Sequence, residues 1–312
     1  MKRVLLVLMI ALMMAGTVVA QNGRFGKPSQ EEWELTSVDY APDASAVVLY
    51  KSVDVQYNVS SEFMNRCLNG GTLDGDGFAP SGTVKYFSPD GSSILYEVKV
   101  RIKILKDTGA EYASMDIVTY NEKEDMFLLD DYHNMSVVVF NKVDGKVKKR
   151  KIRDFKDERL NDHYFIRHVR VPDVKAGDII EYQYKLFSNR ITYIYNTQMQ
   201  EGVPVLYSGC RMEVPYFLQF NVNKPEHPNV KADVRLGGIM VERPSNDRQA
   251  PKRCASNVYE IEARNLPAFD GVIDQQNVNS GKVLTVRTEL KEKTRDAKSD
   301  PVGPVRHLII GK

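Results

Sequence analysis

The stretch VPDVKAGDIIEYQYKL, Val171–Leu186, decides the fold of this chain. Pro172 cannot donate a hydrogen bond to a strand ladder, and Gly177 permits a sharp turn. The segment Asp178–Leu186 then has the composition of a strand, and a second strand pattern, Tyr164–Val171, precedes the turn. The sequence therefore predicts that the chain leaves one strand here and enters the next.

The same strand pattern continues outward in both directions, whereas helical periodicity is scarce. Asp144-Gly145 predicts a tight hairpin, because both central positions of such a turn need positive φ, and Pro89-Asp90-Gly91 predicts another turn. Short helices are expected at Ser29–Leu35 and Ser61–Cys67. The predicted class is all-β, a large antiparallel β-sandwich with short helices, and its further strands are Ala46–Tyr57, Thr83–Phe87, Ile94–Leu105, Tyr112–Thr119, Val137–Phe140, Lys146–Ile152, Val205–Pro215, Val230–Leu236, Val258–Ala263 and Val283–Leu290.

The first residues read as an export signal. Lys2-Arg3 precedes the apolar run Val4–Ala15, and Val18-x-Ala20 offers a cleavage site. We expect a signal peptide at residues 1–20, a single β-sandwich domain at 21–290 and a flexible, charged tail at 291–312. No later stretch approaches the roughly 20 apolar residues of a membrane span, so no transmembrane segment is expected after cleavage. The predicted location is the periplasm, the outer surface or the medium.

The charge of the mature chain is balanced. The signal carries two of the 43 basic residues and none of the 41 acidic ones, so 41 of each remain. The basic run Lys146–Arg153 predicts a sheet edge at which like charges discourage association between strands. Binding of an anionic envelope polymer is the alternative. Nucleic acid is not expected, because the protein is exported and the run lacks interleaved aromatic residues.

Three cysteines, Cys67, Cys210 and Cys254, allow at most one internal disulfide, and their spacing leaves the pairing open. A nucleophilic cysteine needs a histidine in reach, and the residues around Cys67 show no helical start that would lower a thiol pKa. We therefore predict no catalytic residue. The spacing of the histidines predicts no metal site either, and no cofactor is expected; those considered are His133, His163, His168 and His227.

Two further patterns have a structural and a functional interpretation. Asp74-Gly75-Asp76-Gly77 is similar to the start of a calcium loop, but Phe78 fills the third acidic position and no bidentate glutamate follows, which favours a solvated loop. The alternating tyrosines fit either the core between two sheets, which is the more common case, or a platform that stacks on sugars; they are Tyr182, Tyr184, Tyr193 and Tyr195.

Several segments, taken in order, resemble the uncharacterised β-rich domain at the N-terminus of exported bacterial transglutaminase-like proteins. They are Phe25-Gly26-Lys27 with Glu31, Ala46–Tyr50, Val171–Tyr182, Pro204–Ser208 and Asn265–Ala268. In that family a papain-like core follows and supplies Cys, His and Asp, whereas Gly271–Lys312 shows no such motif. The resemblance carries over no functional residue, and Asn196-Thr197-Gln198 stands where the family tends to have a large aromatic.

The sequence thus favours a noncatalytic, exported module that binds a protein or a glycan of the bacterial envelope, without enzymatic activity of its own. Two alternatives stay open. One is a cysteine-dependent peptidase or transglutaminase-like enzyme that uses Cys67. The other is a carbohydrate-binding module that uses the tyrosines between Tyr182 and Tyr195.

Overall fold

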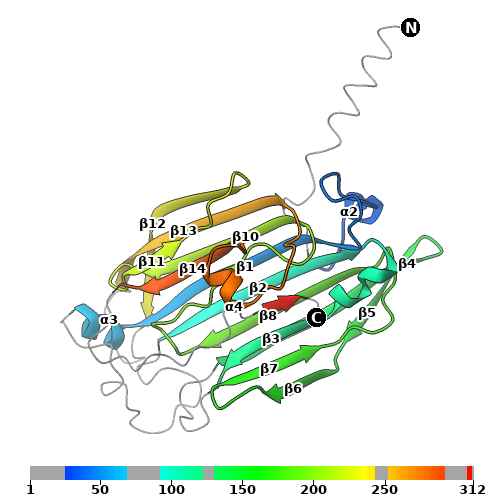
Figure 1. Ribbon diagram of the computed structural model, residues 1–312. Coiled ribbons are helices and arrows are strands. Elements are labelled where there is room, and N and C mark those ends of the chain that lie inside the picture. Colours follow the sequence, from blue (N-terminus) through cyan, green and yellow to red (C-terminus); the bar gives the residue numbers. More distant parts are fainter. Residues whose placement is uncertain (1–24, 69–91, 122–129, 243–251, 292–307, 311–312) are drawn as a thin grey trace.

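A large curved sheet of eight strands organises the computed structural model, which describes residues 25–68, 92–121, 130–242, 252–291 and 308–310 (Figure 1). One half of the sheet is antiparallel, with β1 beside β2, then β8, β4 and β5. On its other side β1 pairs with β10, β10 with β13, and β13 with β12. The strands are β1 Ala46–Ser60, β2 Ser93–Ile104, β4 Asp130–Val143, β5 Lys146–Ile152, β8 Ile179–Ser188, β10 Val205–Pro215, β12 Val230–Glu242 and β13 Lys252–Leu266.

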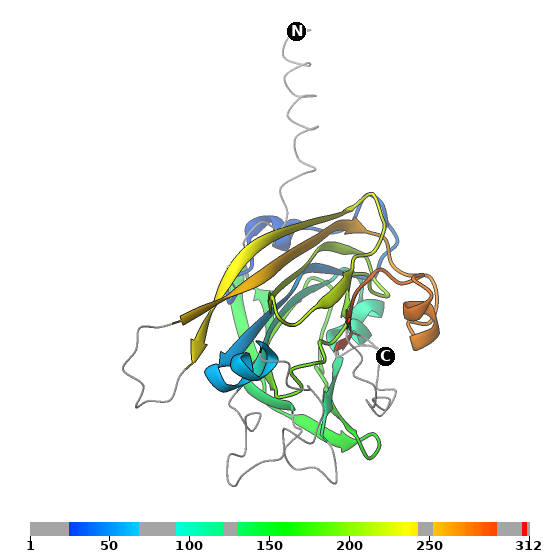
Figure 2. The same cartoon turned by 90° about the vertical axis from the view of Figure 1, so that its left-hand side faces the viewer.

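Two smaller antiparallel sheets lie against one face of the large sheet, which curves over them (Figures 1 and 2). The first contains β15 Leu308–Ile310, β3 Met115–Tyr120, β7 Tyr164–Val169 and β6 Phe155–Arg159, in that order. The second contains β11 Phe220–Asn223, β14 Thr285–Leu290 and β9 Thr197–Gln198. Short helical segments complete the fold: α2 Gln30–Glu34, α3 Ser61–Leu68, the 3₁₀ helix η2 Asp107–Ala113 and α4 Gln275–Asn279.

The alternation along β1 separates two apolar layers. Ala46 and Val48 face the main core, which the large sheet shares with the two small sheets, whereas Val47 and Leu49 face the opposite, outer side. There they pack with Phe140 and with the partly buried residues that surround α2. We call the side of the main core the inner face and the other side the outer face.

Local sequence explains the elements that were predicted correctly. Ser29 accepts a hydrogen bond from the Glu32 N–H, and the Glu32 carboxylate accepts one from the Ser29 N–H, so a capping box starts α2. Asp144 and Gly145 both have positive φ and join β4 to β5. Leu35 caps the predicted first helix, and the second extends one residue further than predicted, to Leu68.

The stretch Val171–Leu186 connects the two layers. It leaves β7 of a small sheet and enters β8 of the large one, and Gly177 has a φ of 92° at the turn. The N–H of Gly177 also donates to the Ile104 carbonyl, which ties the turn to β2. The predicted turn is confirmed, and its role is to carry the chain between sheets.

The all-β class is confirmed, but the expectation of purely antiparallel sheets is wrong for the large sheet. β1 runs parallel to β10, and its end, Val59–Ser60, runs parallel to the end of β12. Strand direction depends on long connections, which residue alternation does not reveal. Tyr112, expected in a strand, lies in η2, and β3 begins at Met115.

Several predictions lie outside the described residues: the signal peptide, the strand Thr83–Phe87, the turn at Pro89 and the loop at Asp74. Of the segment expected to be a flexible tail, Leu308–Ile310 pairs with β3 as β15, and residues 292–307 lie outside the described part. The limits of the predicted domain stay a prediction.

Candidate functional site

An open groove of about 310 Å³ lies on the outer face of the large sheet, across β2, β1, β10 and β13. Alternation places residues two apart on the same side of each strand, so Tyr50 and Asp54 of β1 line it together, as do Tyr207 and Arg211 of β10. The register sets Asp54 directly beside Arg211. The groove therefore follows from the parallel pairing of two strands that are far apart in the sequence.

Two stacked tyrosines form one end of the groove. The ring centroids of Tyr50 and Tyr207 are 5.2 Å apart, with 15° between the planes, and Phe25 contacts Tyr50 edge-on. Gly209 makes this arrangement possible, because a Cβ there would lie 2.7 Å from the Tyr207 hydroxyl. Arg264 stands over the Tyr207 ring at 4.9 Å. This end of the groove is thus aromatic, with the guanidinium of Arg264 beside the rings.

The rest of the groove carries mixed charges with an acidic excess. Arg211 contacts Asp54 at 3.3 Å and Glu260 at 3.8 Å. Lys99 contacts Glu97 at 2.8 Å, and this hydrogen bond lowers the pKa of the Glu97 carboxyl. With Glu262, four carboxylates face two cations along the lining. Outside the lining, Arg235 lies 3.0 Å from Glu260 and Arg264 lies 3.6 Å from Glu262, so cations also pair with both glutamates of β13.

Two buried ion clusters hold the sheet around the groove. Arg101 of β2 contacts Glu32 of α2 at 2.6 Å and pairs with Glu181 of β8, and all three side chains are buried. On the inner face, Lys51 of β1 pairs with Glu201, and Gln198 also donates to Glu201 at 2.7 Å. Because an unpaired buried charge is costly, each cluster fixes the element that carries it.

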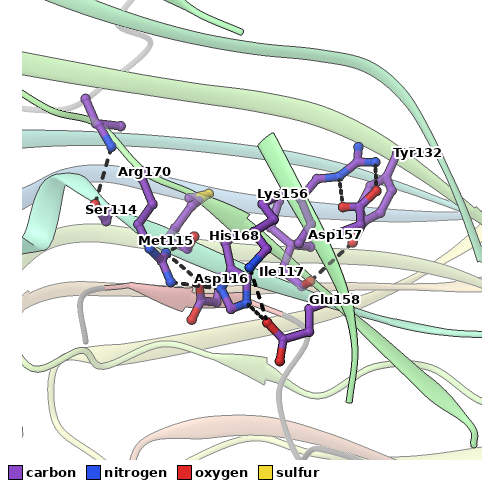
Figure 3. A network of polar contacts seen from close by, with 12 residues as sticks. Ser114, Met115, Asp116, Ile117, Tyr132, Lys156, Asp157, Glu158, His168 and Arg170 are labelled. Carbon is purple, nitrogen blue, oxygen red and sulfur yellow. Dashed lines mark hydrogen bonds and ion pairs between the residues drawn. The ribbon is translucent and has the colours of Figure 1, made fainter. Parts of the chain in front are cut away.

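A polar network on the small sheet that contains β3, β7 and β6 has the side-chain types of a catalytic site (Figure 3). His168 Nδ1 lies 2.9 Å from Asp116 Oδ1 and 2.8 Å from Arg170 Nη2, and Nε2 lies 3.6 Å from Glu158. Arg170 also donates to Asp116 at 2.6 Å. Nδ1 can donate to Asp116 or accept from Arg170, but one nitrogen cannot do both at once. The described contacts of His168 are with two carboxylates and a guanidinium. The hydroxyl of Ser114, the serine of this network, accepts a hydrogen bond from the Val171 N–H.

The structure describes all three cysteines, and no disulfide joins them. Cys210 is buried in the main core, and this burial raises the pKa of its thiol to about 12. Burial also raises the pKa of Cys254. Cys67, the residue considered for catalysis, is half-buried in α3 and packs against the main core.

The histidines considered as metal ligands lie apart. His133 pairs with Asp131 at 3.0 Å, His163 stacks on Tyr120, and the His227 ring accepts from the Asn229 N–H. Within the described ranges, no group of three or more His, Cys, Asp or Glu side chains is placed to hold a metal ion. In the same part of the chain, every helix is too short or too polar to cross a membrane.

The alternating tyrosines belong to the core. Tyr182, Tyr184 and Tyr195 are buried, and Tyr193 is half-buried against them. The Tyr195 hydroxyl donates to Asp130, and Tyr193 stacks on the Arg190 guanidinium at 4.2 Å. The interpretation as core packing is confirmed, so these rings offer no platform for a sugar.

Residues Lys146–Ile152 of the basic run form β5, the outer strand of the antiparallel half of the large sheet, as its charges predicted, and Arg153 follows the end of the strand. Lys149 donates to the Gly26 carbonyl and Arg150 to the Pro172 carbonyl, while the other basic side chains of β5 are exposed or partly exposed.

The groove itself was missed by sequence reasoning. Tyr50 and Tyr207 each lie in a strand that was predicted, but no pattern in either strand shows that the two strands are neighbours. The one local signal is the glycine two residues after Tyr207, which leaves room for a ring on that side of the strand.

The described residues thus form an all-β module with an open, aromatic and charged groove on the outer face of its large sheet. The chain belongs to the DUF3857 family, a domain of unknown function with a solved structure, whose model matches residues 89–270. A similar solved structure is that of a Parabacteroides distasonis protein provisionally described as a protease, with a TM-score of 0.46 and 15% sequence identity. The match covers 78% of this chain and 40% of that one, so this chain spans less than half of its length. A search of the curated proteins found no match.

Proposed function

We propose that this chain is an exported, noncatalytic binding module of the bacterial cell envelope, of the type that precedes transglutaminase-like domains. Its ligand is a segment of a protein partner that lies in the groove beside Tyr50 and Tyr207. The observation that carries the proposal is the groove itself, an open site on the outer face with stacked rings and unequal charges.

The lining indicates the chemistry of that segment. Glu260 and Glu262 lie on β13 at one side of the groove and Glu97 lies on β2 at the other, while the cations of the lining are Lys99 on β2 and Arg211 on β10. A lysine or arginine of the partner would meet these carboxylates. The groove therefore fits an extended segment with basic side chains better than an anionic polymer.

The state of two thiols argues against cysteine chemistry at their positions. The thiolate is the nucleophilic form, and burial keeps Cys210 and Cys254 protonated at neutral pH. Cys67 is the thiol through which the enzymatic alternative would act. An iodoacetamide-sensitive hydrolase or transferase activity that disappears in Cys67→Ser would contradict the proposal.

Affinity capture from solubilised envelope tests the site directly. The bait is the mature protein in three forms: wild type, Glu262→Lys in the groove, and Glu289→Lys as a matched control on β14. Both glutamates are substantially exposed, so neither change removes a buried contact. We expect a specific protein partner that Glu262→Lys loses and Glu289→Lys retains, because the new lysine repels a basic segment. Equal capture by all three forms would contradict the groove as the binding site.

A further inference from the structure

The two outer strands of the large sheet differ in how they are protected against pairing. β5 carries Lys146 and Lys148–Lys151, so two copies of it would repel each other. β12 has no such run, and its exposed segment contains no proline. Between Lys231 and Leu236 both faces of β12 are exposed. Because the charges of this segment differ in sign, β12 lacks the like-charge repulsion that protects β5.

The backbone N–H and C=O groups of β12 point alternately toward β13 and toward solvent. The Arg264 N–H donates to the Asn229 carbonyl, so in the antiparallel ladder the odd-numbered residues of β12 face β13. The N–H and C=O groups of Ala232, Val234 and Leu236 consequently point away from it. In the described part of the chain, β12 pairs elsewhere only at its end, where Val241 and Glu242 meet β1. The edge at Val234 is open to another strand.

Apolar side chains accompany these open groups. Val234 is 57% exposed and Leu236 is 77% exposed, and the register with β13 places Val234 on the inner face beside the partly buried Tyr259. The inner face thus continues past the cover of the small sheets as an uncovered apolar strip. A strand added at this edge would shield it.

We propose that β12 pairs antiparallel with β12 of a second copy, with Val234 opposite Val234 of that copy, so that the two large sheets join into one. The charges of the strand favour β12 of a second copy as the partner strand. In this register Asp233 lies opposite Arg235 of the second copy, and the same contact occurs twice by symmetry. Leu236 lies opposite Ala232 of the second copy. The strand is therefore complementary to itself in both charge and apolar side chains.

The contact also brings a cation opposite Asp233. Asp233 stands directly across from Glu260 of β13, and like charges in opposite positions destabilise a ladder. Arg235 contacts Glu260 at 3.0 Å and is 52% exposed, so it stands on the same face as Asp233 at the open edge. The two neighbouring registers that keep the open backbone groups facing each other would set Asp233 against Asp233 or Arg235 against Arg235. Charge therefore selects the register centred on Val234.

Sedimentation velocity of the mature protein over a concentration series tests this pairing. We expect the mass to rise from that of one copy toward twice that value. Asp233→Arg and Arg235→Asp should each weaken association by about tenfold, because each opposes like charges twice. The double variant that exchanges the two charges should restore association. Lys231→Gln is the matched control and should leave association unchanged, because residue 231 would face the uncharged Gly237 and glutamine sets no like charge against Glu262 of β13.

Val234→Pro provides the second test. Its lost N–H points away from β13, so the ladder within one copy is kept, and circular dichroism can confirm that the variant folds. We expect this variant to stay a single copy at all concentrations. A wild-type protein that stays a single copy at the highest concentration, or a charge-exchanged variant that fails to recover association, would overturn the proposal. Association only with an added extended peptide would overturn it in favour of a different occupant.

Discussion

At the scale of single residues, buried charges connect segments that are distant in the sequence. Lys51 and Glu201 are 2% and 1% exposed, and they join β1 to the segment that precedes β10. The pair contributes specificity more than net stability, since two charges lose their hydration to make it. Its removal therefore has different effects depending on whether one partner or both are replaced.

Lys51→Met should lower the free energy of unfolding by about 3–5 kcal/mol, because Glu201 is left as an unpaired buried charge. The double variant Lys51→Met/Glu201→Leu should recover most of this loss. Lys99→Met is the control: its partner Glu97 is half-buried, and the loss should stay below about 1 kcal/mol. Chemical denaturation measures all three. Equal losses in the single and the double variant would contradict the account.

Lys103 gives a prediction about pH. Burial, together with repulsion from Lys142, lowers the pKa of Lys103 to about 8 from 10.5. Between these values the unfolded chain binds more protons than the folded one, so the contribution of Lys103 to stability increases as the pH rises through this window. Titration followed by NMR of the Lys103 side chain should give a pKa near 8, and Lys142→Gln should raise it. An unchanged pKa in that variant would exclude Lys142 as a cause.

At the scale of elements, the start of β1 depends on a close backbone approach. A Cβ on Gly109 of η2 would lie 2.1 Å from the Ser45 carbonyl oxygen, which is closer than two such atoms can approach. Because this oxygen belongs to the backbone, no side-chain rotation can relieve the clash. Ser45 also accepts hydrogen bonds from the N–H groups of Leu105 and Lys106. The junction between η2 and β1 therefore requires glycine.

Gly109→Ala should cost about 2–4 kcal/mol, since the turn or the strand must move. Gly202→Ala is the matched control, because a Cβ there would meet only a Tyr112 ring carbon at 3.9 Å, an ordinary contact. Thermal unfolding of both variants measures the difference. A Gly109→Ala protein as stable as Gly202→Ala would show that the junction is not constrained.

The elements also show what the sequence could predict. Lys146–Ile152 and Val205–Pro215 match β5 and β10 in full, because both have strand composition and clear ends. β6 was missed because Phe155 is the only apolar residue among its charges, and β9 and β11 are too short to show a pattern. The parallel contact of β1 with β10 was beyond prediction because it depends on the path of the chain between them, and the groove was missed for the same reason.

At the scale of the whole molecule, the two faces of the large sheet have different structural roles. The inner face packs with the small sheets to form the main core, and the outer face holds the groove with stacked rings and an excess of carboxylates. His168 and its neighbours lie on a small sheet (Figure 3), whereas the groove lies on the outer face of the large sheet. We therefore place the proposed function on the outer face, through contact with a partner.

Site-specific photocrosslinking in the native envelope tests this claim most directly. A photoreactive phenylalanine derivative replaces Tyr207 in the groove or, as a control, Val272, which is 72% exposed and does not line the groove. We expect one discrete protein adduct from position 207, identified by mass spectrometry, and none from position 272. The same adducts from both positions, or no protein adduct from position 207, would contradict the assignment of the groove as a partner-binding site.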